Sequence, residues 1–209
     1  MAVAGAESDS QDLHRQRLLV ALASEGVIDW DHHTLNSAVT LCSNLMAHPD
    51  LVSQRQVVMV SEEVFLHRFT SEDDRTLCLK LSQLYGDALG QLGRVSRAVQ
   101  VCEKLLADLD GTTGRRSVEG LRARGSLGWW LGQAGRWSEA TVMYQELLKD
   151  RSRLLGPRAV ETLRTRHNAA WFLNRQGRTR EAVREFEILL RDQVAVLGPD
   201  SVDTISTQH

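Results

Sequence analysis

The feature that most constrains this chain is a segment that occurs twice, 42 residues apart. Residues 135–157 read "GRWSEATVMYQELLKDRSRLLGP" and residues 177–199 read "GRTREAVREFEILLRDQVAVLGP". Both contain Gly-Arg, Glu-Ala, an aromatic residue, Leu-Leu and Leu-Gly-Pro in the same order, and the Gly-Arg pair occurs a third time at 93–94. A fixed period of this length indicates a repeat architecture, in which each unit buries its apolar face against its neighbours.

Each repeat has the pattern of two helices. In the last full repeat, the apolar residues between 163 and 173 follow helical spacing and not strand alternation. Gly177 then ends the first helix, as a glycine just past the last turn commonly does. A second helical pattern covers 182–194 and stops at Gly198 and Pro199.

Small residues recur at fixed places in the repeat. Two antiparallel helices joined by a tight turn approach closely only where one surface lacks a bulky side chain. We therefore expect leucine at Gly128 or Ala140 to overpack the crossing, at a cost of about 1–3 kcal/mol. The two series are Gly86, Gly128, Ala170 and Ala98, Ala140, Ala182.

This pattern of small residues, glycine, aromatic residue and leucine pair resembles the tetratricopeptide repeat. With "LGPDSVDTI" at the end of a unit and "TRHNAAW" in the next first helix, it is most similar to the kinesin-light-chain-like subfamily, of a type common in actinobacterial proteins. The resemblance covers about 72–209. It implies an all-α, right-handed α-solenoid of antiparallel helix pairs, whose first helices line a concave groove that binds a partner without catalysis.

The predicted organisation begins with a degenerate helical cap. We expect a helix from Ser10 to about Glu25, and then a helical hairpin formed by "LNSAVTLCSNLMAH" and "VSQRQVVMVSEEVFLHRF". The short restart after the third repeat favours a piece of a longer protein. The predicted divisions are a disordered N-terminus at 1–9, the cap at 10–71, repeats at 72–113, 114–155 and 156–197, and the start of an incomplete repeat at 198–209.

Charge is distributed unevenly along the chain. The net charge is −2, but residues 115–184 contain fifteen Lys or Arg against six Asp or Glu, so this segment carries +9 and the remainder −11. This segment supports nucleic-acid binding as an alternative function. No helix-turn-helix or RNA-module signature accompanies it, so nucleic acid is the weaker candidate.

Other features favour a cytoplasmic protein without catalysis. Cys42, Cys78 and Cys102 lack CxxC spacing and are interpreted as reduced packing residues. The apolar run at 18–23 is too short for a signal peptide or a membrane span. No phosphate loop, HExxH or GxSxG sequence occurs. We therefore expect no catalytic residue, no cofactor and no membrane partner.

A histidine pair is the one candidate metal cluster in the sequence. His32 and His33 lie near Asp29 and Asp31, but no second group of ligands follows at a fixed spacing. A solvated loop before a helix explains them better, so we expect no metal.

The resemblance also assigns the groove residues, at the second, fifth, sixth, ninth, twelfth and thirteenth positions of each first helix. The second position is basic three times, the ninth holds two tryptophans, and Gly90, Gly125 and Gly132 would leave small gaps. Asn168 matches an asparagine that holds peptide backbones in kinesin-light-chain-like repeats. The predicted peptide-binding residues are Lys80, Gln83, Asp87, Arg122, Ser126, Trp129, Gln133, Arg164, His167, Asn168, Trp171 and Arg175.

Structural explanations compete with these assignments. The tryptophans could pack against a neighbouring loop, and the basic positions could form a solvated face paired with nearby acids.

The leading hypothesis is therefore a protein-interaction module that binds an acidic peptide or partner segment, as a sensor or regulatory part of a longer protein. A self-assembling scaffold is a further alternative. It would associate as a homo-oligomer through the C-terminal end, where Val183, Phe186 and Leu190 lack an assured cover.

Overall fold

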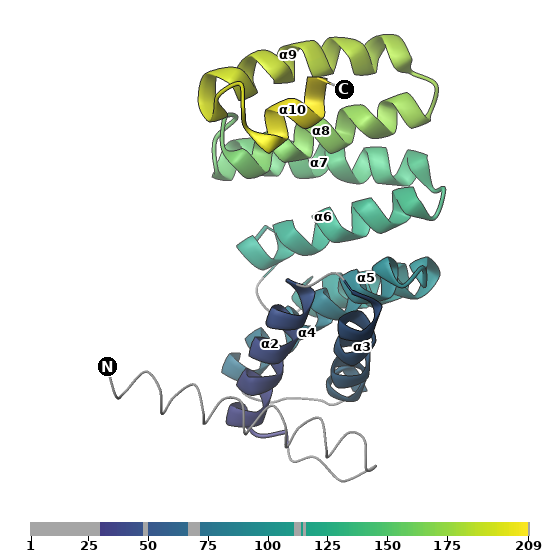
Figure 1. The fold of residues 1–209 in the computed structure, drawn as a ribbon, viewed down its shortest axis with the longest axis vertical. Coiled ribbons are helices and arrows are strands. Elements are labelled where there is room, and N and C mark those ends of the chain that lie inside the picture. Colours follow the sequence, from purple (N-terminus) through teal and green to yellow (C-terminus); the bar gives the residue numbers. More distant parts are fainter. Residues whose placement is uncertain (1–29, 48–49, 67–71, 111–113, 115, 209) are drawn as a thin grey trace, which may run out of the picture. The chain divides into compact units, whose positions relative to one another are not determined.

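The computed structural model describes all residues except 1–29, 48–49, 67–71, 111–113, 115 and 209 (Figure 1). Within the described residues the regular structure is entirely helical, and the helices are labelled α2 to α10. This confirms the all-α prediction. The predicted helix at Ser10–Glu25 and the predicted disordered N-terminus lie outside the described residues.

The chain divides into two compact units, Met1–Val101 and Cys102–His209. The six helices expected between residues 72 and 196 are confirmed, with bounds within a few residues of the repeat pattern. The helices are α2 (His32–Met46), α3 (Leu51–Leu66), α4 (Glu72–Gln91), α5 (Val95–Asp110), α6 (Val118–Gln133), α7 (Trp137–Leu154), α8 (Val160–Arg175), α9 (Thr179–Leu197) and α10 (Val202–Gln208).

The first unit contains the predicted hairpin as α2 and α3, both packed against α4. Asp31 caps α2 by accepting a hydrogen bond from the backbone N–H of Thr34. Leu35, Val57 and Tyr85 are among the residues buried in this unit. The hairpin of the degenerate cap is thus present.

His32 and His33 do not lie in a loop. They are the first residues of α2, and His32 Nδ1 is 2.9 Å from Asp74 Oδ1 of α4. The sequence interpretation was wrong here because Asp31, and not a later residue, provides the helix cap.

In the second unit each helix packs against the next one along the chain, from α6 to α10. The turn after α6 uses Gly135 at φ 79°, in the left-handed region that favours glycine, and the backbone N–H of Arg136 bonds to the carbonyl of Leu131. Arg136 then forms two 2.6 Å hydrogen bonds to Glu139. Arg178 and Glu181 repeat this pairing one unit later.

Small residues do permit the close helix crossing. A Cβ built on Gly128 would lie 2.9 Å from the ring of Tyr144 on α7, and Ala140 is fully buried. The Tyr144 hydroxyl also donates to the carbonyl oxygen of Gly125 across the same crossing, at 3.0 Å. The packing reason proposed for this series is therefore confirmed at Gly128.

One glycine expected to leave a gap in the groove does not do so. A Cβ on Gly132 would fall 1.9 Å from Phe172 of α8, so the aromatic ring already fills that space. A Cβ on Gly125 would make ordinary van der Waals contact with Leu147 and Arg151 of α7, at 3.7 Å. The glycine at 132 therefore reflects close helix packing.

A partly buried ion pair joins the two helices of each repeat in this unit. Arg124 of α6 donates to Asp150 of α7 at 2.6 Å, and Arg166 of α8 donates to Asp192 of α9 at the same distance. The two pairs are 42 residues apart. The hydrogen bond from Arg124 is the main reason that the pKa of Asp150 lies below its ordinary value.

The cysteines have the packing environment expected of them. Cys42 and Cys102 are buried, Cys78 is half-buried, and all three are free thiols. Burial raises the pKa of Cys42 and of Cys78 to about 12, which keeps both thiols protonated at neutral pH. Across the described helices, none combines the length and the apolar character that a membrane crossing requires.

Candidate interaction site

The predicted groove residues divide between the two units. Lys80, Gln83 and Asp87 lie on α4 of the first unit, where Lys80 is exposed and the other two are half-buried. Their place in a common groove stays a prediction. The other nine form what we call the α6–α8 face, in the second unit: Arg122, Ser126, Trp129 and Gln133 of α6, and Arg164, His167, Asn168, Trp171 and Arg175 of α8.

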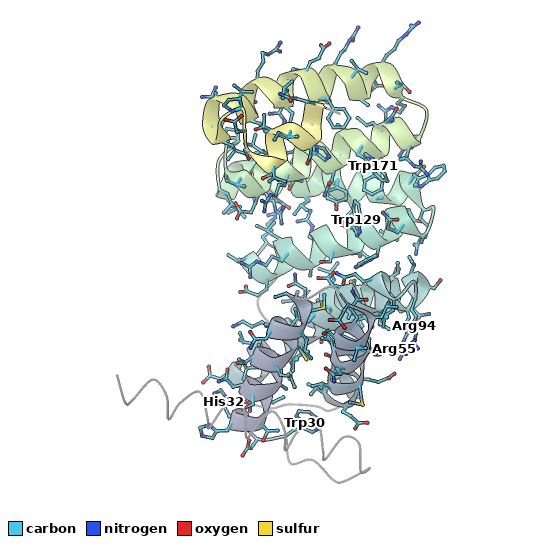
Figure 2. The ribbon with its side chains drawn as sticks, in the orientation of Figure 1. Trp30, His32, Arg55, Arg94, Trp129 and Trp171 are labelled. Carbon is cyan, nitrogen blue, oxygen red and sulfur yellow. The ribbon has the colours of Figure 1, made fainter. Side chains whose placement is uncertain are left out.

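Two indoles form the centre of the α6–α8 face (Figure 2). The ring centroids of Trp129 and Trp171 are 5.9 Å apart with an interplanar angle of 33°, and both residues are half-buried. Phe172 lies edge-on beneath them, 4.8 Å from Trp171 and 6.3 Å from Trp129. Contacts within α6 and α8 therefore hold the rings, and part of each indole remains open to solvent.

Arg175 extends this aromatic group toward the end of α8. Its guanidinium carbon lies over the Trp171 ring at 5.6 Å and over the Trp137 ring at 5.1 Å. Cation–π contacts of this length are stabilising. Trp137, the first residue of α7, is 37% exposed and was missed by sequence reasoning, which considered only first helices. The sequence feature that could have pointed to Trp137 is its position directly after the Gly135 turn.

Helix α10 contacts the other end of the face. Arg164 Nε donates to both carboxylate oxygens of Asp203, at 3.2 and 2.9 Å. His167 Nδ1 is 3.0 Å from the Thr207 hydroxyl, and its ring packs on Phe186 of α9. Burial lowers the pKa of His167, although the charge of Asp203 opposes the shift. Arg164 and His167 are thus already engaged within the chain.

The remaining residues of the α6–α8 face differ in their exposure and in whether another residue of the chain contacts them. Arg122 is exposed and has no ion pair among the described residues. The Asn168 side-chain amide donates to the Tyr144 hydroxyl at 3.1 Å, which ties it to α7. Ser126 is half-buried and Gln133 is exposed. The face therefore offers cations and indoles more readily than amides.

Several arginines of the basic segment 115–184 form ion pairs within the chain. Three of the partners, Glu103, Asp192 and Asp203, lie outside the segment itself, which is why its sequence alone suggested an uncompensated surface. The paired residues are Arg116, Arg124 and Arg153 with Asp150, Arg136 with Glu103 and Glu139, Arg158 and Arg166 with Asp192, Arg164 with Asp203, and Arg178 with Glu181.

Comparison with known proteins agrees with this geometry. The family model described as "Tetratricopeptide repeat" matches residues 121–158 and 162–203. These two segments of the second unit are tetratricopeptide repeats, and the fold is the all-α solenoid that such repeats form. No curated protein matches the sequence.

Solved structures with a similar fold include kinesin-light-chain-like proteins. Two forms of a Podosopora anserina protein, described as a kinesin light chain with nearly identical TPR-like repeats, are 17% and 16% identical, with TM-scores of 0.68 and 0.66. Each match covers 92% of this chain and 89% of that one. BtubC (BKLC) from P. vanneervenii is 15% identical with a TM-score of 0.67, over 97% of this chain and 78% of that one.

Another similar structure is the apo form of RapI, which is 8% identical with a TM-score of 0.65. The match covers 84% of this chain and 61% of that one. At these identities the likeness shows the fold alone.

Proposed function

We propose that this chain is a non-catalytic protein-interaction module whose α6–α8 face binds an acidic segment of a partner protein. The observation that carries the proposal is the half-exposed Trp129–Trp171 pair, with Arg175 over the Trp171 ring and Arg122 seven residues before Trp129 on α6. Neither arginine has a carboxylate partner among the described residues. Tryptophan and arginine are the residue types that most often dominate binding energy at protein interfaces.

The chain itself supplies an example of the chemistry. Arg164 occupies the same repeat position as Arg122, and it holds Asp203 of α10 through both carboxylate oxygens. A carboxylate from a partner would give Arg122 the contact that Asp203 gives Arg164. Complementary charge of this kind steers the encounter and fixes the orientation of the bound segment.

Nucleic-acid binding has weaker support. A phosphate-binding surface needs several free cations in a row, since affinity rises with each phosphate neutralised. Most arginines of 115–184 instead have carboxylate partners at 4.0 Å or less. The tetratricopeptide fold is typically an interaction scaffold, which also favours protein binding over nucleic-acid binding. We further propose that the chain has a regulatory role in the cytoplasm.

Calorimetric titration of the full chain tests the proposal. The probes are two blocked peptides, acetylated and amidated, one alternating Ser and Glu and the other alternating Ser and Lys. We expect only the glutamate peptide to bind, and Trp129→Ala to weaken its binding about tenfold or more, because the indole supplies apolar contact. Equal binding of both peptides, or of neither, would contradict the proposal. Thermal unfolding followed by circular dichroism checks that the variant is folded.

Self-association is a second candidate, favoured by the exposure of apolar residues on α9 and α10. Val183 of α9 and Val202 and Ile205 of α10 are all exposed. Sedimentation velocity over a hundredfold range of concentration tests it, with Ile205→Asp as the variant expected to shift the chain toward monomer. A wild-type chain that stays monomeric throughout would exclude this candidate.

A further inference from the structure

Among the described residues of the α6–α8 face, one cation has no carboxylate partner and is also held in place by aromatic rings. We propose that Arg175, supported by Trp137 and Trp171, is the residue that receives a carboxylate of the bound segment, and that this segment runs along the ends of α6 and α8 beside the Gly135 and Gly177 turns. The inference rests on the proposed function and names the residue that determines its specificity.

The N–H donors of Arg175 have no carboxylate partner among the described residues. Its guanidinium carbon lies over two indole rings. Its N–H donors lie in the guanidinium plane, in a fork that matches a carboxylate bidentately. Two aromatic contacts restrict the side chain before a ligand arrives, so that less conformational entropy remains to be lost on binding.

Other contacts hold this platform rigid. The Gln176 side-chain amide of the α8 cap donates to the backbone carbonyl of Trp137 at 2.9 Å, and it also contacts the Thr141 hydroxyl. These bonds join the end of α8 to the start of α7. Trp137 and Arg175 are therefore held near each other by these hydrogen bonds as well as by the cation–π contact.

The neighbouring cations are poorer candidates. Arg136 and Arg178, in the adjacent turns, each make paired hydrogen bonds to a glutamate. Arg164 is held by Asp203. Within the described residues Arg122 has neither a carboxylate nor a stacked ring, so its side chain is free but not ordered in advance. Among the described residues of the α6–α8 face, only Arg175 both lacks a carboxylate partner and has its guanidinium held by aromatic rings.

The test uses the full chain and the blocked Ser/Glu peptide in calorimetric titrations. We expect Arg175→Gln to weaken binding at least tenfold, and Arg175→Lys to weaken it several-fold, because lysine keeps the charge but lacks the planar fork. The matched control is Arg191→Gln on α9, an exposed arginine far from the Gly177 turn and without an ion pair among the described residues. Its affinity should stay within twofold of wild type.

Trp137 is a positioning residue in this scheme, and a double-mutant cycle tests that role. Trp137→Ala should weaken binding although every charge remains, and Trp137→Phe should restore most of the affinity. Trp137→Ala combined with Arg175→Gln should bind no more weakly than Arg175→Gln alone, because the tryptophan acts through the arginine. Full additivity of the two effects would contradict the positioning role.

Two outcomes separate this inference from the proposed function. If Arg175→Gln binds within twofold of wild type while Arg122→Gln loses tenfold, the assignment of Arg175 is wrong and the proposed function stands. If wild type does not discriminate the Ser/Glu peptide from the Ser/Lys peptide, the proposed function fails and this inference fails with it. Thermal unfolding of each variant shows whether a loss of binding reflects a loss of fold.

Discussion

Helices α7 and α9 have nearly the same sequence pattern but different surroundings. On α7, Thr141 is 4% exposed and Tyr144 is buried, because α8 packs along this face. The corresponding residues of α9 are Val183, which is 49% exposed, and Phe186, which is half-buried. The neighbour of α9 is the seven-residue α10, less than half the length of α8 (Figure 1).

First helices show the same contrast. Leu163 of α8 is fully buried, whereas Ile205, at the same position of α10, is 42% exposed. In a repeat protein each unit contacts mainly its neighbours, so the burial of a position depends on the next unit as much as on its own sequence. Residues at the same repeat position therefore do not contribute equally to the free energy of unfolding.

The largest difference is expected between Tyr144 and Phe186. Tyr144 stacks on Phe172 with ring centroids 5.4 Å apart and bonds to the carbonyl of Gly125. We expect Tyr144→Ala to lower the free energy of unfolding by about 4 kcal/mol, within the range for a buried aromatic residue. Phe186→Ala should cost about 1–2 kcal/mol, because its ring is only half-buried. Urea unfolding followed by circular dichroism measures both, and equal losses would show that α10 covers α9 as fully as α8 covers α7.

A smaller difference is expected between the two repeated ion pairs. The Arg124 and Asp150 side chains are less exposed than those of Arg166 and Asp192. Removing one charge from a buried pair leaves the other uncompensated. Asp150→Asn should therefore lower the unfolding free energy by about 2 kcal/mol and Asp192→Asn by about 1 kcal/mol.

Acid should abolish the effect of Asp150→Asn. The pKa of Asp150 is lowered in the folded chain, so its ionised form stabilises the fold above the ordinary carboxyl pKa of about 4. That contribution is lost as pH falls through the lower folded value. Unfolding measured from pH 7 downward should thus show wild type and Asp150→Asn converging below about pH 4. A constant difference across this range would contradict the role assigned to the ion pair.

Local rules were enough to predict the helices from the sequence. The period, the glycines after each first helix and the spacing of apolar residues depend on interactions within one repeat, and α4 to α9 follow them. The Arg124–Asp150 pair could also have been found, since both residues recur 42 positions later as Arg166 and Asp192. Repetition at equal separation was the signal.

The details of the site depended on contacts between repeats, which the period does not specify. Position counting brought Trp129 and Trp171 to one face, but it could not show that Asp203 holds Arg164, because that contact crosses from one repeat to the next. Trp137 was missed for a similar reason. Its contact with Arg175 joins the second helix of one repeat to the first helix of the following one.

The contact of Gly132 with Phe172 has a consequence for how the chain assembles. Helices of similar pattern can dock on the wrong neighbour during folding, and repeat proteins are prone to such misassembly. The ring of Phe172 needs the space that Gly132 leaves, and α8 offers the larger Asn174 at the matching position. A docking that placed the ring against Asn174 would leave it no such space. The glycine at 132 thus favours docking of Phe172 on α6 over a docking beside Asn174.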